Sequence, residues 1–286
     1  MITGAAGQLG YELQRTAPAG TTLLPVDIAD LDLTIAGDVE SYIAAHRPAV
    51  IINGAAYTAV DRAEEQPDIA RRVNVTAATH VAESARGHGA RVIHISTDFV
   101  FGGATSRPWQ PDDPTAPESV YGLTKRDGEQ VVLSTLGANA LVVRTAWLYS
   151  AHGGNFVKTM LRLMAEKDEV RVIADQVGTP TWANSLARTL WAAVARPAVN
   201  GTLHWTDAGV ASWYDFAMAI QEEAIMRRLL TRAVPVLAIP TSAYPTPARR
   251  PSYSVLDKSE TTARLAESPV HWRTNLRLML DELTHA

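Results

Sequence analysis

Short apolar runs alternate with longer segments of helical spacing over the first half of the chain. Four runs are rich in valine, isoleucine and leucine at consecutive positions, at residues 22–26, 50–53, 91–96 and 140–144. This pattern is typical of strands buried on both faces. Segments with helical spacing lie at residues 7–17, 38–46, 67–87 and 119–136. Such alternation predicts a parallel sheet with right-handed crossovers and helices on both faces.

The alternation weakens after residue 150. The pattern there predicts helices at 153–166, 183–196, 212–229 and 271–284, and short strands near 170–173, 201–205 and 236–239. Several prolines in residues 240–252 exclude a helix and indicate an ordered coil or a lid. We interpret residues 1–150 as one domain and residues 151–286 mainly as a smaller α/β lobe over the carboxyl edge of the sheet. The boundary is approximate, and the chain is free to cross back.

A glycine-rich turn follows the first apolar residues. Gly4, Gly7 and Gly10 read GxxGxxG before the first predicted helix. Such glycines allow a tight turn and a close backbone approach to a pyrophosphate, which the N–H groups at a helix start bind. Three glycines also fit an ordinary turn, but their place between a strand and a helix favours a dinucleotide site. Only Met1 to Thr3 precede the turn, so we expect either a very short, destabilised first strand or a missing N-terminal extension of a few residues.

Small and acidic residues follow the next two predicted strands. Asp27 lies about 20 residues beyond the turn, where an acid accepts from a ribose 2′-hydroxyl and favours NADH over NADPH. A capping or turn role for Asp27 stays open, and so does the cofactor. Asp32 and Leu33 are candidates to flank the adenine. Ala55 and Ala56 follow Asn53-Gly54 at a strand end, where small side chains allow either a close cofactor approach or only a tight exit.

The candidate catalytic group is Thr97, Tyr121 and Lys125. Thr97 ends a predicted strand, and Tyr121 and Lys125 stand four apart on one face of the next predicted helix. A phenol has a pKa of about 10, and we expect the neighbouring ammonium and a cationic nicotinamide to lower it. Thr97 supplies a hydroxyl for a carbonyl oxygen. A proton donor, a group that tunes it and an orienting hydroxyl are what carbonyl reduction needs.

Composition narrows the functional classes. The 286 residues carry a net charge of -4, which gives no electrostatic basis for binding nucleic acid or an anionic membrane. The absence of cysteine excludes thiolate catalysis and cysteine metal sites and fits a reducing cytoplasm. Eight histidines without an HExxH motif disfavour a metal hydrolase.

With these motifs the chain resembles the extended short-chain dehydrogenase/reductases, and within them the dTDP-4-dehydrorhamnose reductase family. Other matching segments are Ala55–Asp61, Ser96–Phe101, Arg144–Tyr149, Asn155–Val157, Asp175–Thr181 and Arg250–Ser254. The resemblance implies a Rossmann-type fold and a cytoplasmic, NADH- or NADPH-dependent reduction of the C4 ketone of dTDP-4-dehydro-L-rhamnose to dTDP-L-rhamnose.

Motifs and resemblance together assign the site residues. Contact with the cofactor is expected for Gly4, Gly7, Gln8, Leu9, Gly10, Asp27, Asp32, Leu33, Ala55, Ala56, Tyr57, Thr58, Tyr121 and Lys125. Contact with the sugar nucleotide is expected for Thr97, Asp98, Trp147, Asn155 and Arg250. An indole face stacks well on a sugar or base, although Trp147 also fits a core position. Arg249 and Arg250 fit either a diphosphate or solvent.

One departure concerns a metal. Some members of this family dimerise around Mg²⁺ held by glutamates, and Glu12 and Glu282 match two of those positions. Asn184 stands at the third and supplies no charge, whereas Mg²⁺ prefers anionic oxygens. We therefore expect no metal-bridged dimer, but a monomer or a weak homodimer.

Two other functions stay open. One is an extended-family epimerase or 4,6-dehydratase, although Asp98-Phe99 lacks the Asp-Glu pair of the dehydratases. The other is a non-catalytic NAD(P)-binding regulatory subunit, such as that of methionine adenosyltransferase. Thr97, Tyr121, Lys125 and Trp147 together favour catalysis.

Overall fold

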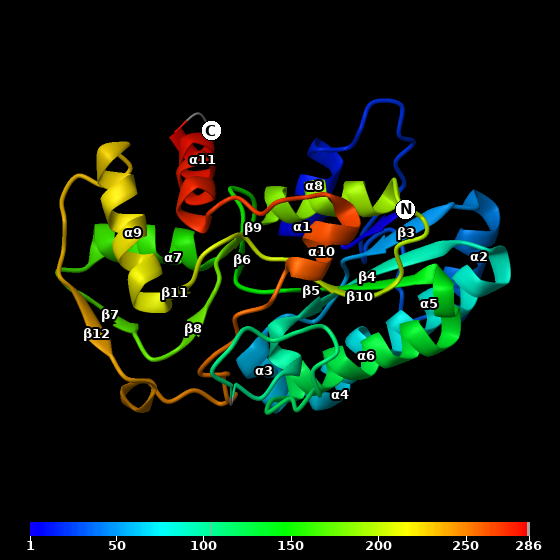
Figure 1. The fold of residues 1–286 in the computed structure, drawn as a ribbon, viewed down its shortest axis with the longest axis horizontal. Helices are drawn as coiled ribbons and strands as arrows, with labels where there is room; N and C mark the ends of the chain where they lie inside the picture. The colour runs from blue at the N-terminus through cyan, green and yellow to red at the C-terminus, as the bar shows by residue number, and fades with distance from the viewer. Residues whose placement is uncertain (104, 285–286) are drawn as a thin grey trace.

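A six-stranded parallel sheet lies at the centre of the computed structural model, which describes residues 1–103 and 105–284 (Figure 1). Its strands are β1 (Ile2–Thr3), β2 (Pro25–Val26), β3 (Val50–Asn53), β4 (Arg91–Thr97), β5 (Ala140–Thr145) and β10 (Gly201–His204). They follow the order β10-β5-β4-β3-β1-β2, and every neighbouring pair is parallel. The predicted parallel sheet is confirmed.

Helices cover both faces of this sheet, as the alternating pattern predicts. On one face α1 (Gln8–Arg15) packs with α8 (Ala183–Val194), and on the other lie α2 (Ala36–His46), α5 (Ala77–His88) and α6 (Val120–Leu136). Successive strand residues point to opposite faces. Accordingly, Ile51 belongs to the buried cluster under α2 and α5, and Ile52 to the cluster under α1 and α8.

The helical pattern at 67–87 is divided in the structure. The segment contains α4 (Pro67–Arg71), a π-helical turn η1 (Arg72–Thr76) and then α5, and α3 (Val60–Glu65) precedes it. There are also two 3₁₀ turns beside strands of the sheet. The first, η2 (Asp98–Val100), follows β4, and the second, η3 (Gly137–Asn139), joins α6 to β5.

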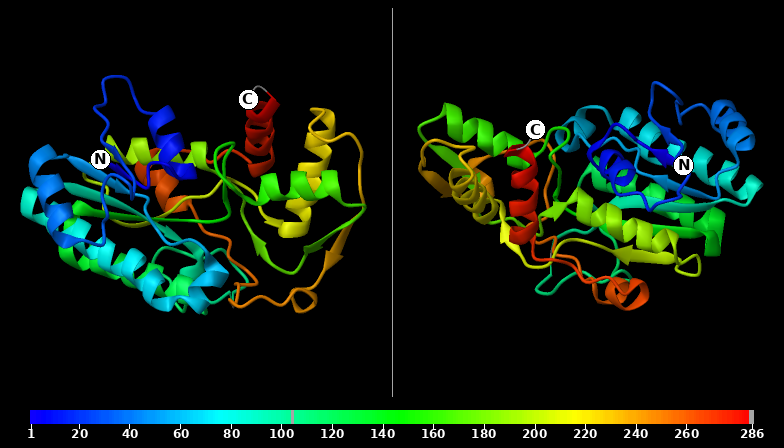
Figure 2. Two further views of the ribbon diagram at one scale, coloured as in Figure 1. Left: turned by 180° about the vertical axis from the view of Figure 1, so that it is seen from behind. Right: turned by 90° about the horizontal axis from the view of Figure 1, so that it is seen from above.

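A second hydrophobic core lies beyond the carboxyl edge of the sheet (Figure 2). It is formed by α7 (Phe156–Glu166), α9 (Trp213–Met226), α11 (Trp272–Thr284) and the paired strands β7 (Val170–Ile173) and β12 (Val236–Ile239). Two short pairs link it to the sheet. They are β6 (Leu148–Tyr149) with β9 (Thr181–Trp182), and β8 (Val177–Gly178) with β11 (Ala211–Ser212).

Two segments differ from the simplest division at residue 150. The strand predicted at 201–205 is β10, and it belongs to the large sheet because it pairs with β5. The helices α8 and α10 (Ser259–Leu265) also pack on the large sheet's side of the molecule, since α8 contacts α1 and α10 contacts β10. The proline-rich segment 240–252 is coil except for one 3₁₀ turn, η4 (Thr241–Ala243), so the expected absence of any helix is wrong for these three residues. Proline 240 precedes the turn and loses no hydrogen bond there.

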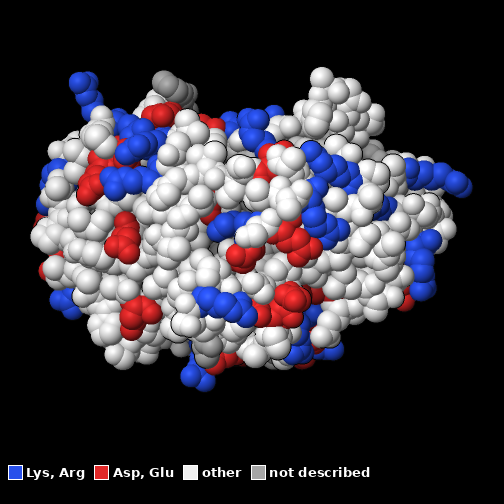
Figure 3. Space-filling model, viewed as in Figure 1, with Lys and Arg blue, Asp and Glu red and all other residues white. Residues whose placement is uncertain are grey.

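Within the described residues, no helix combines the length and apolarity needed to cross a membrane. Positive and negative side chains are interspersed over the face of the molecule in Figure 3.

Candidate active site

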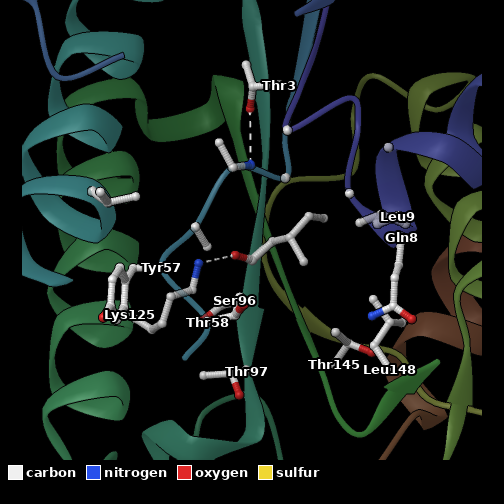
Figure 4. Close-up of a pocket in the computed structure, with 18 of the residues that line it drawn as sticks. Thr3, Gln8, Leu9, Tyr57, Thr58, Ser96, Thr97, Lys125, Thr145 and Leu148 are labelled. Atoms are coloured by element: carbon white, nitrogen blue, oxygen red, sulfur yellow. Dashed lines mark hydrogen bonds between the residues drawn. The ribbon is translucent and has the colours of Figure 1, made fainter. Parts of the chain in front are cut away.

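A cavity of about 950 Å³ lies at the carboxyl edge of the sheet. The ends of β1, β3, β4 and β5 and the starts of α1 and α6 contribute to it. Figure 4 shows Gln8 and Leu9 on one side and Tyr57, Thr58 and Lys125 on the other. Every residue that the sequence assigns to cofactor or sugar nucleotide lines this cavity. Arg249 is not among the lining residues, and its Nε lies 4.0 Å from Glu118 Oε2. The roles of the lining residues stay predictions.

The glycine turn has the shape that a pyrophosphate needs. Gly4 has a positive φ of 66°, and Gly7 N donates to Gly4 O at 3.0 Å. A Cβ on Gly10 would lie 2.3 Å from Gly4 O, so any side chain there would open the turn. The helix α1 begins directly after Gly7, which has no side chain to cap the first N–H groups. These residues therefore fit a dinucleotide whose phosphates meet the start of α1.

Asp27 both holds this turn and lines the cavity. Its Oδ2 accepts from Ala6 N at 2.8 Å, and its Oδ1 accepts from Ile28 N at 2.8 Å. Asp27 therefore serves the turn and is still able to bind a ribose 2′-hydroxyl, since one carboxylate oxygen accepts more than one donor. Asp32, further along the cavity wall, accepts from the Thr34 side chain and backbone, and these hydrogen bonds lower the pKa of its carboxyl group.

The predicted catalytic trio comes together at the other end of the cavity. Ser119 caps α6 by accepting from Gly122 N at 3.1 Å, so the helix begins at Val120 and Tyr121 lies in its first turn. Thr97 ends β4, and its Oγ1 donates to Asp98 Oδ1 at 3.0 Å and accepts from Phe99 N at 3.2 Å. Lys125 Nζ donates to Ile95 O at 2.6 Å.

Burial is the largest influence on the pKa values of Tyr121, Lys125 and Asp98. It raises the pKa of Tyr121 to about 12, and hydrogen bonding with Thr97 acts in the opposite direction. Without a cofactor the net shift of the phenol pKa is therefore upward, and the expected lowering by Lys125 together with a cationic nicotinamide stays a prediction. Burial lowers the pKa of Lys125 to about 8, and its ammonium bonds to the Ile95 carbonyl. Burial also raises the pKa of Asp98 to about 6.

Two tryptophans form the wall nearest the second core. Trp147, in a left-handed conformation with φ of 48°, stacks on Trp213 with ring centroids 3.5 Å apart and an interplanar angle of 5°. Both rings line the cavity. Trp147 is thus half of a stacked pair that packs against the second core and also faces the cavity.

Asn155 and Arg250 line the cavity but already have protein partners. Asn155 caps α7 through Oδ1, which accepts from Lys158 N at 3.1 Å, while Nδ2 donates to Gln8 Oε1 and Ser150 O. Arg250 makes a bidentate pair with Asp61, with Nη1 to Oδ1 at 3.0 Å and Nη2 to Oδ2 at 2.6 Å. A diphosphate contact by Arg250 would share its guanidinium with this pair.

Two residues of the site carry no signal in the sequence: Trp213, which lines the cavity, and Asn74, which is buried and bonds to the lining residue Tyr57. Trp213 follows the Ser212 cap of α9, far from the nucleotide motifs. Asn74 lies in the π-helical turn, where its Oδ1 accepts from Tyr57 N at 2.8 Å and its Nδ2 donates to Thr124 Oγ1 at 3.0 Å. It therefore joins the loop after β3 to the helix that carries Tyr121. Only the folded chain brings these segments together.

Protein side chains link the three positions that match the family's metal site. Asn184 Nδ2 donates to Glu12 Oε2 at 2.8 Å, and Arg15 bonds to both Glu12 and Glu282. Among the residues that the structure describes, no group of three His, Asp or Glu side chains is arranged to hold a metal ion.

This fold, with a phenol and an ammonium buried at the carboxyl edge of its parallel sheet, places the chain among the extended short-chain dehydrogenase/reductases. A family model described as the RmlD substrate binding domain matches residues 1–285. The dTDP-4-dehydrorhamnose reductase of Streptomyces griseus is 44% identical over 281 residues, which cover 96% of this chain and 91% of the relative. The chain belongs to this family, that of the dTDP-4-dehydrorhamnose reductases.

Two further relatives bear on the chemistry. A probable dTDP-4,6-dihydroxy-2-methyloxan-3-one 4-ketoreductase of Streptomyces antibioticus is 43% identical and covers 97% of this chain and 92% of its own length. The crystal structure of the Bacillus anthracis dTDP-4-dehydrorhamnose reductase in complex with NADP is 35% identical, with a TM-score of 0.93 and coverage of 98% of both chains.

Proposed function

We propose that this protein reduces the C4 ketone of dTDP-4-dehydro-L-rhamnose to dTDP-L-rhamnose with NADPH or NADH. The observation that carries the proposal is the convergence of Thr97, Tyr121 and Lys125 in the same cavity as the glycine turn. Family membership supports the substrate class, because curated relatives act as reductases of dTDP-linked ketosugars.

Tyr121 and Lys125 have separate roles in the proposed reduction. The reduced nicotinamide, when bound, supplies the hydride that C4 of the ketone accepts. Tyr121 gives its phenolic proton to the C4 oxygen, so that the carbonyl becomes an alcohol. Lys125 lies one helical turn away and offers a positive charge that stabilises the resulting phenolate. Its burial makes that charge effective, because little water screens it.

Thr97 and Asp98 orient the ketone. In the structure the Thr97 hydroxyl donates to Asp98 Oδ1. A ketone oxygen has no hydrogen to offer, so Thr97 must rotate its hydroxyl away from Asp98 to donate to the substrate. The stacked Trp147 and Trp213 form the apolar wall against which the deoxysugar rests.

The cofactor preference is a separate question. Asp27 favours NADH because a carboxylate repels a 2′-phosphate, whereas the Bacillus anthracis relative was solved with NADP. The preference therefore stays open between the two cofactors, and the ratio of kcat/KM for NADH and NADPH measures it.

A monomer or weak homodimer and a cytoplasmic location also stay predictions. Arg15 and Asn184 satisfy the Glu12 carboxylate within one chain, which supports assembly without a bridging metal. Light scattering with and without Mg²⁺ measures the oligomeric state.

The decisive assay follows NAD(P)H oxidation with dTDP-4-dehydro-L-rhamnose and identifies the product by NMR. We expect turnover that needs both the dTDP group and the C4 ketone. Cofactor binding without oxidation of NAD(P)H would instead indicate the regulatory class. Faster turnover of dTDP-4,6-dihydroxy-2-methyloxan-3-one would assign the protein to the activity of the Streptomyces antibioticus relative.

A further inference from the structure

A loop from the second half of the chain holds the glycine turn from outside the sheet. We call residues 150–155, between β6 and α7, the clasp loop. Its Ser150 Oγ donates to Glu12 Oε1 at 2.8 Å, and its Asn155 Nδ2 donates to Gln8 Oε1 at 3.0 Å. His152 Nε2 bonds to Ala6 O at 2.9 Å. Three side chains of one short loop thus reach the seven residues 6–12.

His152 makes the most direct of these contacts. A carbonyl oxygen only accepts hydrogen bonds, so Nε2 of His152 carries the hydrogen that it gives to Ala6 O. The imidazole also stacks on the Tyr11 ring, with centroids 4.3 Å apart and an interplanar angle of 9°. Stacking on α1 fixes the ring plane and therefore the direction of the N–H bond.

The bond from His152 holds a peptide at the critical point of the turn. The Ala6–Gly7 peptide accepts from His152 through its oxygen and donates to Gly4 O through its nitrogen at 3.0 Å. A peptide unit is planar, so two bonds on opposite edges fix its tilt. This peptide immediately precedes the first N–H groups of α1, which point at the proposed phosphate site.

The other two contacts hold the same region from further along α1. The Glu12 carboxylate is fully buried and accepts from Ser150 and Asn184. Asn155 fixes the side chain of Gln8, which lines the cavity. Asn155 Nδ2 donates to Gln8 and to the Ser150 carbonyl, so its amide group lies beside the residues that we expect to bind the cofactor.

We propose that His152 is a positioning residue for the dinucleotide, which acts through the Ala6 carbonyl to hold the glycine turn in its phosphate-binding shape. This inference rests on the proposed function, since it concerns the same cofactor. It predicts a change in cofactor affinity and little change in the sugar site or in folding.

Three variants separate the hydrogen bond from the stacking. His152→Phe keeps an aromatic ring over Tyr11 and removes the donor. His152→Gln lacks the ring but restores an N–H donor. His46→Phe is the matched control, because His46 stacks on Tyr42 at 4.0 Å and bonds to the Tyr42 carbonyl on α2, away from the glycine turn.

The readouts are the Kd of NADPH and NADH by fluorescence, the KM of the dTDP-ketosugar at saturating cofactor, and Tm. For His152→Phe we expect a cofactor Kd about three- to tenfold higher, the value of one hydrogen bond. The KM of the sugar should change less than about twofold. His152→Gln should recover most of the affinity, and His46→Phe should match the wild type.

Two results would overturn the inference. One is a lower Tm for His152→Phe with an unchanged cofactor Kd, which would make the contact purely structural. The other is an equal rise in cofactor Kd and sugar KM, which would show a general distortion of the cleft. A wild-type protein that binds no dinucleotide would instead overturn the proposed function, and this inference with it.

Discussion

Tyr121 is the residue on which the proposed chemistry depends most. Its phenol is buried, with a pKa raised to about 12, so it carries its proton at neutral pH and acts as an acid. We expect Tyr121→Phe to lower kcat by about 10²–10⁴-fold, the usual contribution of a positioned proton donor. The Kd of NADPH should stay near the wild-type value, because the ring and its packing remain. A loss of less than about tenfold would assign the proton to another group.

Asp207 offers a test of buried charge away from the cavity. Burial raises the pKa of its carboxyl group to about 6 from 3.8, although Ser185 Oγ and Trp182 N donate to it. The folded state therefore holds the proton more tightly than the unfolded state. Stability from this group is present below pH 3.8 and is lost as pH rises towards about 6.

Asp207→Asn should remove that dependence. We expect the free energy of unfolding of the wild type to fall relative to the variant by on the order of 3 kcal/mol between pH 4 and 7. Urea denaturation of both proteins across this range measures the difference. Parallel curves for the two proteins would show that Asp207 does not titrate differently in the folded state.

At the scale of elements, Gly178 in β8 decides where Trp147 lies. A Cβ on Gly178 would come within 2.6 Å of Trp147 Cε2 and 2.8 Å of Ser254 Oγ. Gly178→Ala should push the indole out of its stack on Trp213 and into the cavity. We expect the KM of the dTDP-sugar to rise by about tenfold or more, since overpacking costs about 1–3 kcal/mol.

The control for that variant is Gly37→Ala in α2, where the added Cβ has no described atom within 4 Å apart from its chain neighbours and the nearby helix backbone. This change should leave KM alone and raise stability by about 0.5–1 kcal/mol, as alanine favours a helix. An unchanged sugar KM in Gly178→Ala would mean that Trp147 does not contact the substrate.

The length of each element explains which of them the sequence predicts. The runs at β3 and β4 are rich in valine and isoleucine, and their predicted bounds agree with the structure to within one residue. The strands β6, β8, β9 and β11 have two residues each, which is too short for any periodicity. The π-helical turn at Arg72–Thr76 keeps the apolar spacing of its neighbours, so the pattern predicts one continuous helix there.

The site follows the same logic. Gly4, Tyr121 and Lys125 stand in local motifs whose spacing carries meaning before folding. Trp213 reaches the cavity, and Asn74 reaches the lining residue Tyr57, only because distant segments pack together, and no local pattern marks either residue. His152 is similar, since its contact with Ala6 spans 146 positions.

At the scale of the whole molecule, the cavity lies between two hydrophobic cores that share its walls. A ligand there binds the folded state alone. We expect NADPH at 100 times its Kd to stabilise the protein by about 2.7 kcal/mol, or roughly 5–10 °C in Tm. Differential scanning fluorimetry measures this shift, with adenosine as the control. A Tm unchanged by NADPH would contradict a dinucleotide site.

The return of β10 to the large sheet has a consequence for synthesis on the ribosome. Until residue 204 has emerged, β5 presents an open row of N–H and C=O groups along its outer side. Open strand edges invite pairing with other chains. The nascent protein therefore passes through a stage prone to aggregation that ends only after residue 204 of the 286 has been made, and a fragment that stops at residue 150 would remain in it.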